Sequence, residues 1–216
     1  FAVISGENFW HNDRGVVASD GFVEPPVVTE TSVRFTVKNR YVSKDGNTTI
    51  CQEVARYELS KNADGYLIRM ENEFSSDQAI TFGVKEEMGM ALRVASAIRV
   101  KQGAGEIASA SGRQNEKGTW GKVDQWWDYH GTMNDHSVGL QIMSGDGNPP
   151  VWAHSRDYGL LVANPFPVDV KENRALTKVV PPGETFRLRF GVQVHESASR
   201  DAYDPAAAYQ RYAKQP

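Results

Sequence analysis

The segment HSRDYGLLVANPF, residues 154–166, places four side chains capable of proton transfer or ion binding directly before an apolar run. If the apolar run is a buried strand, alternation puts His154, Arg156 and Tyr158 on one face and Asp157 on the other. Histidine is the usual acid or base near neutral pH, and arginine binds carboxylates or hydroxyls. The segment therefore predicts a polar site, the alternative being that His154 is an ordinary structural residue of a strand.

A second polar segment, NEKGTWGKVDQWWDYHG (residues 115–131), combines Trp120, Trp126 and Trp127 with Asp128 and Tyr129. Aromatic faces stack on sugar rings, and neighbouring carboxylates bind hydroxyl groups, so this composition is typical of a sugar site. Tryptophan pairs also fill ordinary cores, which is the competing interpretation. The polar, glycine-rich residues 101–118 predict a long loop over the site.

A third segment, FGVKEEMGMALRV (residues 82–94), predicts a strand with methionines and aliphatic residues on one face. The opposite face carries Glu87, Gly89, Ala91 and Arg93, and its two small residues leave room for a ligand between the charges. A solvated sheet face is the alternative.

Alternation with a period of two dominates the chain, and turn signals separate the alternating runs. This pattern predicts an all-β fold, an antiparallel β-sandwich, rather than alternating helices and strands. The predicted strands lie within residues 32–38, 66–74, 88–94, 137–143 and 187–194, and the predicted turns are residues 44–47, 62–65, 144–150 and 181–184.

One helix is expected at the C-terminus, at about residues 204–214. Asp204 is a suitable N-cap, Pro205 suits the first helical position, and three alanines follow. No linker or repeat interrupts the chain, so residues 1–216 are interpreted as a single β-sandwich domain.

Composition excludes several function classes. The formal net charge of -3, with no basic run, argues against nucleic acid as a partner. No stretch approaches the roughly 18 apolar residues of a membrane-spanning helix. Cys51 is the only cysteine, which excludes an internal disulfide, and its alternating neighbours indicate a buried strand residue. The five histidines show no metal-ligand spacing and no nucleotide-binding fingerprint is present, so neither a metal nor another cofactor is predicted.

The chain starts in an apolar, strand-like run, FAVISGENFW, without a cap or turn before it. This start predicts that an upstream segment is missing and that the domain is truncated at its N-terminus.

Taken together, the three polar segments resemble, in order and spacing, the signature segments of a bacterial family of unknown function labelled "methane oxygenase PmoA". The likeness runs from about Phe1 to His195. Members of that family carry a histidine-rich segment just before the position where this chain begins. The resemblance implies a β-sandwich similar to the galactose-mutarotase group, found among polysaccharide-degradation proteins, and it favours a periplasmic or secreted location.

By this resemblance we expect acid/base chemistry on a sugar, as in an epimerase, lyase or hydrolase, within one cleft of a curved sheet. Glu87 or Asp128 would be the base and His154 the acid. The alternatives are a non-catalytic sugar- or protein-binding module and a metal-dependent oxygenase; oligomeric state is left open. The expected substrate-binding residues, several of them as stacking platforms or hydroxyl binders, are Arg93, Trp120, Trp126, Trp127, Tyr129, Arg156, Tyr158 and Asn164.

Overall fold

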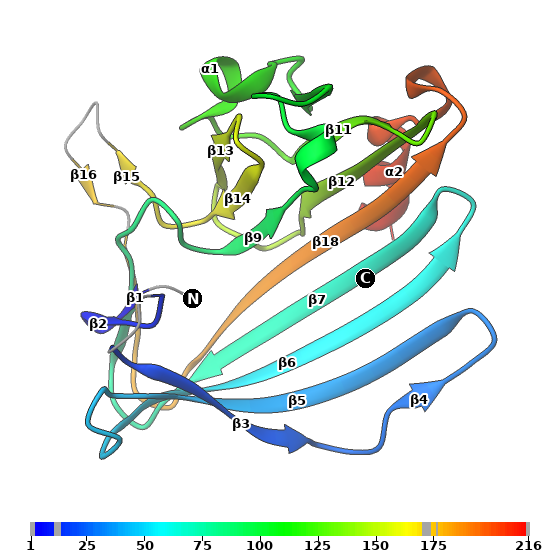
Figure 1. Cartoon of the computed structure of the whole chain (residues 1–216). Coiled ribbons are helices and arrows are strands. Elements are labelled where there is room, and N and C mark those ends of the chain that lie inside the picture. Colours follow the sequence, from blue (N-terminus) through cyan, green and yellow to red (C-terminus); the bar gives the residue numbers. More distant parts are fainter. Residues whose placement is uncertain (1–2, 11–13, 170–173, 176, 215–216) are drawn as a thin grey trace.

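The fold is dominated by one large curved antiparallel sheet (Figure 1). A computed structural model describes residues 3–10, 14–169, 174–175 and 177–214. The strand order is β10-β11-β12-β18-β7-β6-β5-β3, with β4 paired to β5. These strands are β3 (Val16–Phe22), β4 (Val27–Val28), β5 (Ser32–Val42), β6 (Thr49–Asn62), β7 (Gly65–Ser75), β10 (Gly105–Ser109), β11 (Trp126–Met133), β12 (His136–Ser144) and β18 (Thr185–Ser197).

Two smaller sheets pack on the inner face of the large one, and a two-stranded sheet projects beside them (Figure 1). The first has the order β17-β8-β1-β2, the second β13-β14-β9, and a third pairs β15 with β16. Their strands are β1 (Val3–Ile4), β2 (Glu7–Asn8), β8 (Ile80–Phe82), β9 (Met90–Arg93), β13 (Trp152–Arg156), β14 (Leu160–Asn164), β15 (Val168–Asp169), β16 (Arg174–Ala175) and β17 (Lys178–Val180). Every pairing between these strands is antiparallel, which confirms the predicted all-β antiparallel class.

The residues that the sequence predicted to form turns lie in turns between strands. Asn62 and Gly65 close the hairpin between β6 and β7, and the Asn62 side chain accepts a hydrogen bond from the Asp64 N–H. Gly46 turns the chain between β5 and β6 with a φ of 76°, a conformation that glycine adopts without strain. The remaining predicted turns join β12 to β13 and β17 to β18.

The core lies between the inner face of the large sheet and the smaller sheets. Alternate residues of β7 and β18 point inward, so Phe74 and Leu188 are fully buried. Phe74 packs edge-on against Phe82 of β8, with ring centroids 5.1 Å apart. Leu161 of β14 is also fully buried, and Cys51 lies in the same core, as its alternating neighbours predicted.

The C-terminal segment covers the outer face of the large sheet. It consists of η2 (Arg200–Ala202) and the predicted helix, which is confirmed as α2 (Pro205–Ala213). The Asp204 side chain caps α2 by accepting hydrogen bonds from two backbone N–H groups. Tyr212 packs with Trp126 and Met143, and the absence of a side chain at Gly191 makes room for its ring. No helix in the described part of the chain is long and apolar enough to cross a bilayer.

The prediction of a long loop at residues 101–118 was wrong. Residues 105–109 form β10, the edge strand that pairs with β11, and α1 (Asn115–Thr119) follows. A Cβ at Gly105 would collide with the backbone carbonyl of Ile98 in η1 (Ser96–Ile98), so glycine is required by close backbone packing rather than by loop mobility.

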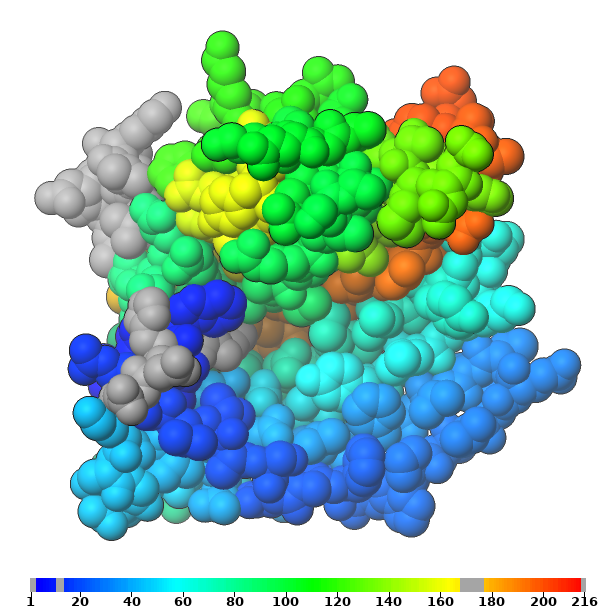
Figure 2. Space-filling model, viewed as in Figure 1, coloured from blue at the N-terminus to red at the C-terminus, as the bar shows by residue number. Residues whose placement is uncertain are grey.

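Part of the inner face of the large sheet is left open. The smaller sheets and α1 lie over β10–β12 and one end of the sheet, and Figure 2 shows the face hollowed beyond them. A row of aromatic residues lies on this open part: Tyr57 of β6 stacks on Phe35 of β5 at 4.9 Å, and Phe22 of β3 packs edge-on against Phe35 at 5.8 Å. Phe22 is 60% exposed.

The position of Trp127 predicts a clear stability difference between two tryptophans. Because Trp127 is fully buried and Trp10 is 50% exposed, Trp127→Ala should lower the free energy of unfolding by about 3–5 kcal/mol. Trp10→Ala should change it by about 0.5 kcal/mol or less. Urea unfolding of the two variants measures both effects, and equal losses would contradict the placement of Trp127 in the core.

Candidate functional site

Strand β11 divides the predicted site residues between two faces of the large sheet. Trp127 and Tyr129 belong to the inner core cluster. Trp126 packs in a separate cluster with Tyr212 of α2, on the outer face, and alternation puts Asp128 on the same side as Trp126. Consequently Asp128 is not brought to His154, which lies on β13 in a sheet that packs on the inner face. The structure therefore contains two polar clusters where one shared cleft was expected.

The first cluster is built around His154. As alternation predicted, His154 and Arg156 share a face of β13, and the Arg156 Nε–H donates to His154 Nε2 at 3.2 Å. Arg156 also donates to Glu116 of α1 at 2.8 Å. On the other side of the imidazole, His154 Nδ1 lies 3.8 Å from a carboxylate oxygen of Glu86. We call Glu86, Glu116, Trp120, His154 and Arg156 the His154 cluster.

Helix α1 is fixed to this cluster by reciprocal bonds. The Glu116 carboxylate accepts from the Asp157 N–H at 3.0 Å, and the Asp157 carboxylate accepts from the Glu116 N–H at 2.9 Å. Thr119 and Ser155 are joined by a buried hydroxyl–hydroxyl hydrogen bond of 2.7 Å. Trp120, which follows α1, is thereby held beside His154 and Arg156, with its ring 6.5 Å from the imidazole.

A small hollow of about 20 Å³ opens within the cluster, lined by Glu86, Trp120, His154 and Asn164 among others. Its volume suits a water molecule or a single hydroxyl group rather than a whole sugar ring. Two buried nitrogen atoms, Trp120 Nε1 and His154 Nδ1, have no hydrogen-bond partner within the described residues. Since a buried polar group without a partner is costly, both atoms are well suited to bind a ligand oxygen.

The proton positions on His154 follow from its neighbours. Arginine only donates, so His154 Nε2 must accept from Arg156, and a neutral His154 carries its proton on Nδ1. Burial, and next the charge of Arg156, lower the pKa of His154, although Glu86, Glu87 and Glu116 act in the opposite direction. His154 is therefore a neutral hydrogen-bond donor near pH 7.

Glu87 lies in a turn, not on the predicted strand, because β9 begins only at Met90. The Asn164 amide holds this turn by donating to the carbonyl oxygens of Lys85 and Glu86, at 2.7 and 2.9 Å. The turn places Glu86, the neighbour of the predicted residue, against His154. Asn164 thus positions the Glu86 carboxylate through the backbone, and it also lines the hollow, so its ligand-binding role stays a prediction.

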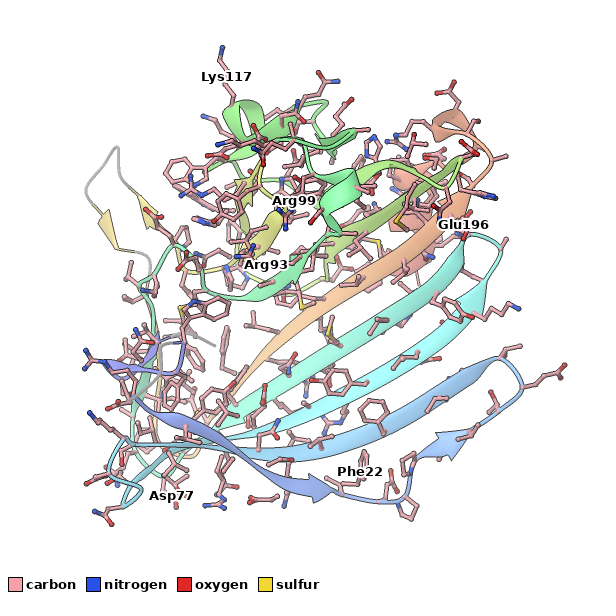
Figure 3. The ribbon with its side chains drawn as sticks, viewed as in Figure 1. Phe22, Asp77, Arg93, Arg99, Lys117 and Glu196 are labelled. Atoms are coloured by element: carbon pink, nitrogen blue, oxygen red, sulfur yellow. The ribbon has the colours of Figure 1, made fainter. Side chains whose placement is uncertain are left out.

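Of the other predicted site residues, Arg93, Tyr158 and Tyr129 contact protein groups, and two of the tryptophans are buried. The Arg93 guanidinium lies over the ring of Tyr158 at 5.4 Å, and Figure 3 shows Arg93 beside β9. The Tyr129 hydroxyl donates to the Asp157 carbonyl at 3.0 Å and accepts from the Val100 N–H. Trp126 and Trp127 are both buried, so neither forms an exposed stacking platform.

The second cluster surrounds Asp128. Its carboxylate is fully buried and lies 2.8 Å from His195 Nε2, 3.1 Å from His130 Nδ1 and 3.4 Å from an Arg200 nitrogen. Burial raises the pKa of Asp128, but the adjacent His130 and His195 side chains, of which His195 is hydrogen-bonded to it, outweigh burial and hold that pKa well below its usual range. Tyr203 stacks on His195 with ring centroids 3.6 Å apart.

The absence of a side chain at Gly139 leaves space for the His195 ring in this cluster. Gly139 lies between His130 and His195 in the sheet, and a Cβ there would collide with the His195 imidazole. The missing side chain lets His195 extend across β12 to reach Asp128 on β11.

Sequence analysis missed Glu86, Glu116 and His195 as members of these clusters. The pair Glu86–Glu87 gave a signal for an acidic turn, but alternation selected Glu87, whereas the carboxylate that lies 3.8 Å from His154 is that of Glu86. His195 ends the alternating run of β18 on the face opposite its apolar residues, which was a usable signal. Within the described residues, no group of three or more His, Cys, Asp or Glu side chains is arranged to hold a metal ion.

A family model described as "Family of unknown function (DUF6807)" matches residues 1–210. The chain belongs to this family. No curated protein matches the sequence.

Two solved structures show distant similarity to this DUF6807 chain, and both are described as sugar-processing proteins. One is a putative kojibiose phosphorylase from human microbiome, at 7% identity and a TM-score of 0.38, covering 83% of this chain and 20% of the other. The second is a putative aldose 1-epimerase from Klebsiella pneumoniae subsp. pneumoniae MGH 78578, at 11% identity and a TM-score of 0.25, covering 93% of this chain and 55% of the other. The DUF6807 chain thus spans a fifth and about half of their lengths.

The lowered pKa of His154 predicts a dependence of stability on pH. In the unfolded chain His154 binds a proton near pH 6.5, whereas in the folded chain its pKa is lower. The stability that depends on neutral His154 is therefore fully present above about pH 6.5. It declines as the pH falls below that value. His154→Gln should therefore lose less stability than the wild type between neutral and mildly acidic pH. Urea unfolding across this range measures the difference, with the surface variant His136→Gln as control. Equal losses in wild type and His154→Gln would contradict the prediction.

Proposed function

We propose that this DUF6807 chain binds a sugar at the His154 cluster and transfers a proton to or from it. The observation that carries the proposal is that Trp120 and His154, each with a buried nitrogen that lacks a partner among the described residues, line one hollow together with Glu86. A hydroxyl group both accepts and donates hydrogen bonds. Two donors beside one carboxylate therefore suit a hydroxylated ligand better than an apolar or a cationic one.

In this proposal Glu86 is the proton acceptor. Its side chain is about half exposed, so a ligand that approaches from solvent reaches it directly. His154 donates its Nδ1 proton in a hydrogen bond to the ligand oxygen that gains negative charge, and it stays neutral because burial and Arg156 disfavour protonation. This role replaces the acid role expected for His154, since a neutral imidazole is a weak acid.

Arg156 is a positioning residue in this arrangement. Its guanidinium connects His154 Nε2 to the Glu116 carboxylate and lies over the Trp120 ring at 5.7 Å. It therefore fixes both the tautomer of His154 and the place of Trp120.

A second candidate is a non-catalytic sugar-binding module. The small volume of the hollow favours it, because only a protruding hydroxyl group fits inside. The aromatic row of Phe22, Phe35 and Tyr57, in which Phe22 is exposed and the other two are partly buried, also offers apolar surface of the kind that binds sugar rings.

A sugar panel with matched variants separates the two candidates. Binding of mono- and disaccharides is measured by calorimetry, and turnover by NMR of the sugar signals. Under the first proposal, His154→Ala weakens binding about tenfold or more by removing a donor. Glu86→Gln retains binding but lowers turnover by about 100-fold or more because the proton acceptor is lost.

Lys117→Ala is the matched control, because Lys117 points away from α1 into solvent (Figure 3). Binding lost in His154→Ala, without any turnover in the wild type, would establish the second candidate. If no sugar of the panel binds more weakly to His154→Ala than to the wild type, both the site and its role are contradicted.

A further inference from the structure

A second hollow, of about 440 Å³, opens beside the Asp128 cluster on the outer side of the large sheet. It lies where the hairpin of β11 and β12 meets the segment leading into η2, and His130 and Arg200 line it. A volume of this size is within the ordinary range of small-molecule sites. The hollow is separate from the His154 cluster, with which it shares no lining residue.

The bonding of Asp128 determines which nitrogen of His130 is free. Asp128 is fully buried and its pKa is held low, so it is a carboxylate, and its negative charge 3.1 Å from His130 Nδ1 favours a proton on that nitrogen, although the two atoms are not aligned as a hydrogen bond. That leaves His130 Nε2 with a lone pair and, within the described residues, without a hydrogen-bond partner. His195 differs, because its Nε2 donates to Asp128 and its remaining nitrogen is buried under the Tyr203 ring.

Arg200 adds a donor to the same site. It lies 3.4 Å from the Asp128 carboxylate, and its side chain remains about one-third exposed at the hollow. His130 and Arg200 together therefore present one acceptor and several donors to whatever occupies the space.

The remaining lining favours an uncharged, hydroxylated ligand. Glu106 and Asp135 contribute two negative charges against the one positive charge of Arg200, and Ser137 and Ser199 contribute polar groups. The surplus of negative charge disfavours an anionic ligand, the exposed Arg200 guanidinium disfavours a strongly cationic one beside it, and the scarcity of large apolar side chains disfavours an apolar one.

We infer that the Asp128 cluster forms a second binding site, in which a polyol or monosaccharide donates a hydroxyl hydrogen bond to His130 Nε2 and accepts one from Arg200. Asp128 is the positioning residue that sets the tautomer of His130. The site is independent of the proposed function at His154.

Histidine NMR on the full chain tests the tautomer and the binding together. The ring nitrogens of His130 should report a proton on Nδ1, and those of His195 a proton on Nε2. D-glucose, myo-inositol and glycerol are then titrated separately, and at least one should shift the His130 Nε2 signal saturably while the exposed His136 signal stays unchanged. The same shift should persist in His154→Ala, so this site and the one at His154 can fail separately.

Chemical acylation of histidine by diethyl pyrocarbonate gives a second readout that does not need a ligand. At about pH 8, where an ordinary imidazole is unprotonated, His130 should react, and Asp128→Asn should slow that reaction about three- to tenfold because the negative charge that polarises the ring is removed, with His136 as internal control. Should the variant fail to fold, the wild-type NMR measurement decides alone. A proton on His130 Nε2, or no His130 shift with any of the three probes, would overturn the inference.

Discussion

The burial of β11 on both faces is the constraint on which the arrangement of polar groups depends. Its five residues from Trp126 to His130 are all buried, although a strand on the surface of a sandwich normally alternates between core and solvent. Its inner side chains, such as Trp127, fill the core, whereas Asp128 and His130 face the C-terminal segment. Because the sheet separates these faces, Asp128 and His154 belong to different polar clusters.

The C-terminal segment is what makes the outer face of β11 a buried environment. Tyr203 covers His195 and hydrogen-bonds to Gln141, while the Gln141 amide donates to the Pro205 carbonyl at 2.8 Å. Covering Asp128 in this way requires partners for its charge, and His130, His195 and Arg200 provide them. The segment therefore shapes one wall of the second hollow as well as closing the sheet.

Sequence patterns predicted the antiparallel strands, the turns and α2 because each depends on local alternation or on turn and capping residues. The same alternation correctly paired His154 with Arg156. Alternation failed at Glu87, because the turn before β9 breaks the period of two. It also failed at residues 105–109, because close backbone packing there selects small and polar residues for a strand. The separation of Asp128 from His154 depends on which layers cover β11, and no local pattern contains that information.

A double-mutant cycle on the free energy of unfolding tests the separation of the two sites most directly. If Asp128 and His154 lie in different clusters, the losses in Asp128→Ala and His154→Ala should add to within about 0.5 kcal/mol in the double variant. Asp128→Ala and His195→Ala, whose side chains are in contact, should instead show a coupling of about 0.5–3 kcal/mol. A coupling between Asp128 and His154 as large as that between Asp128 and His195 would contradict the division into two sites.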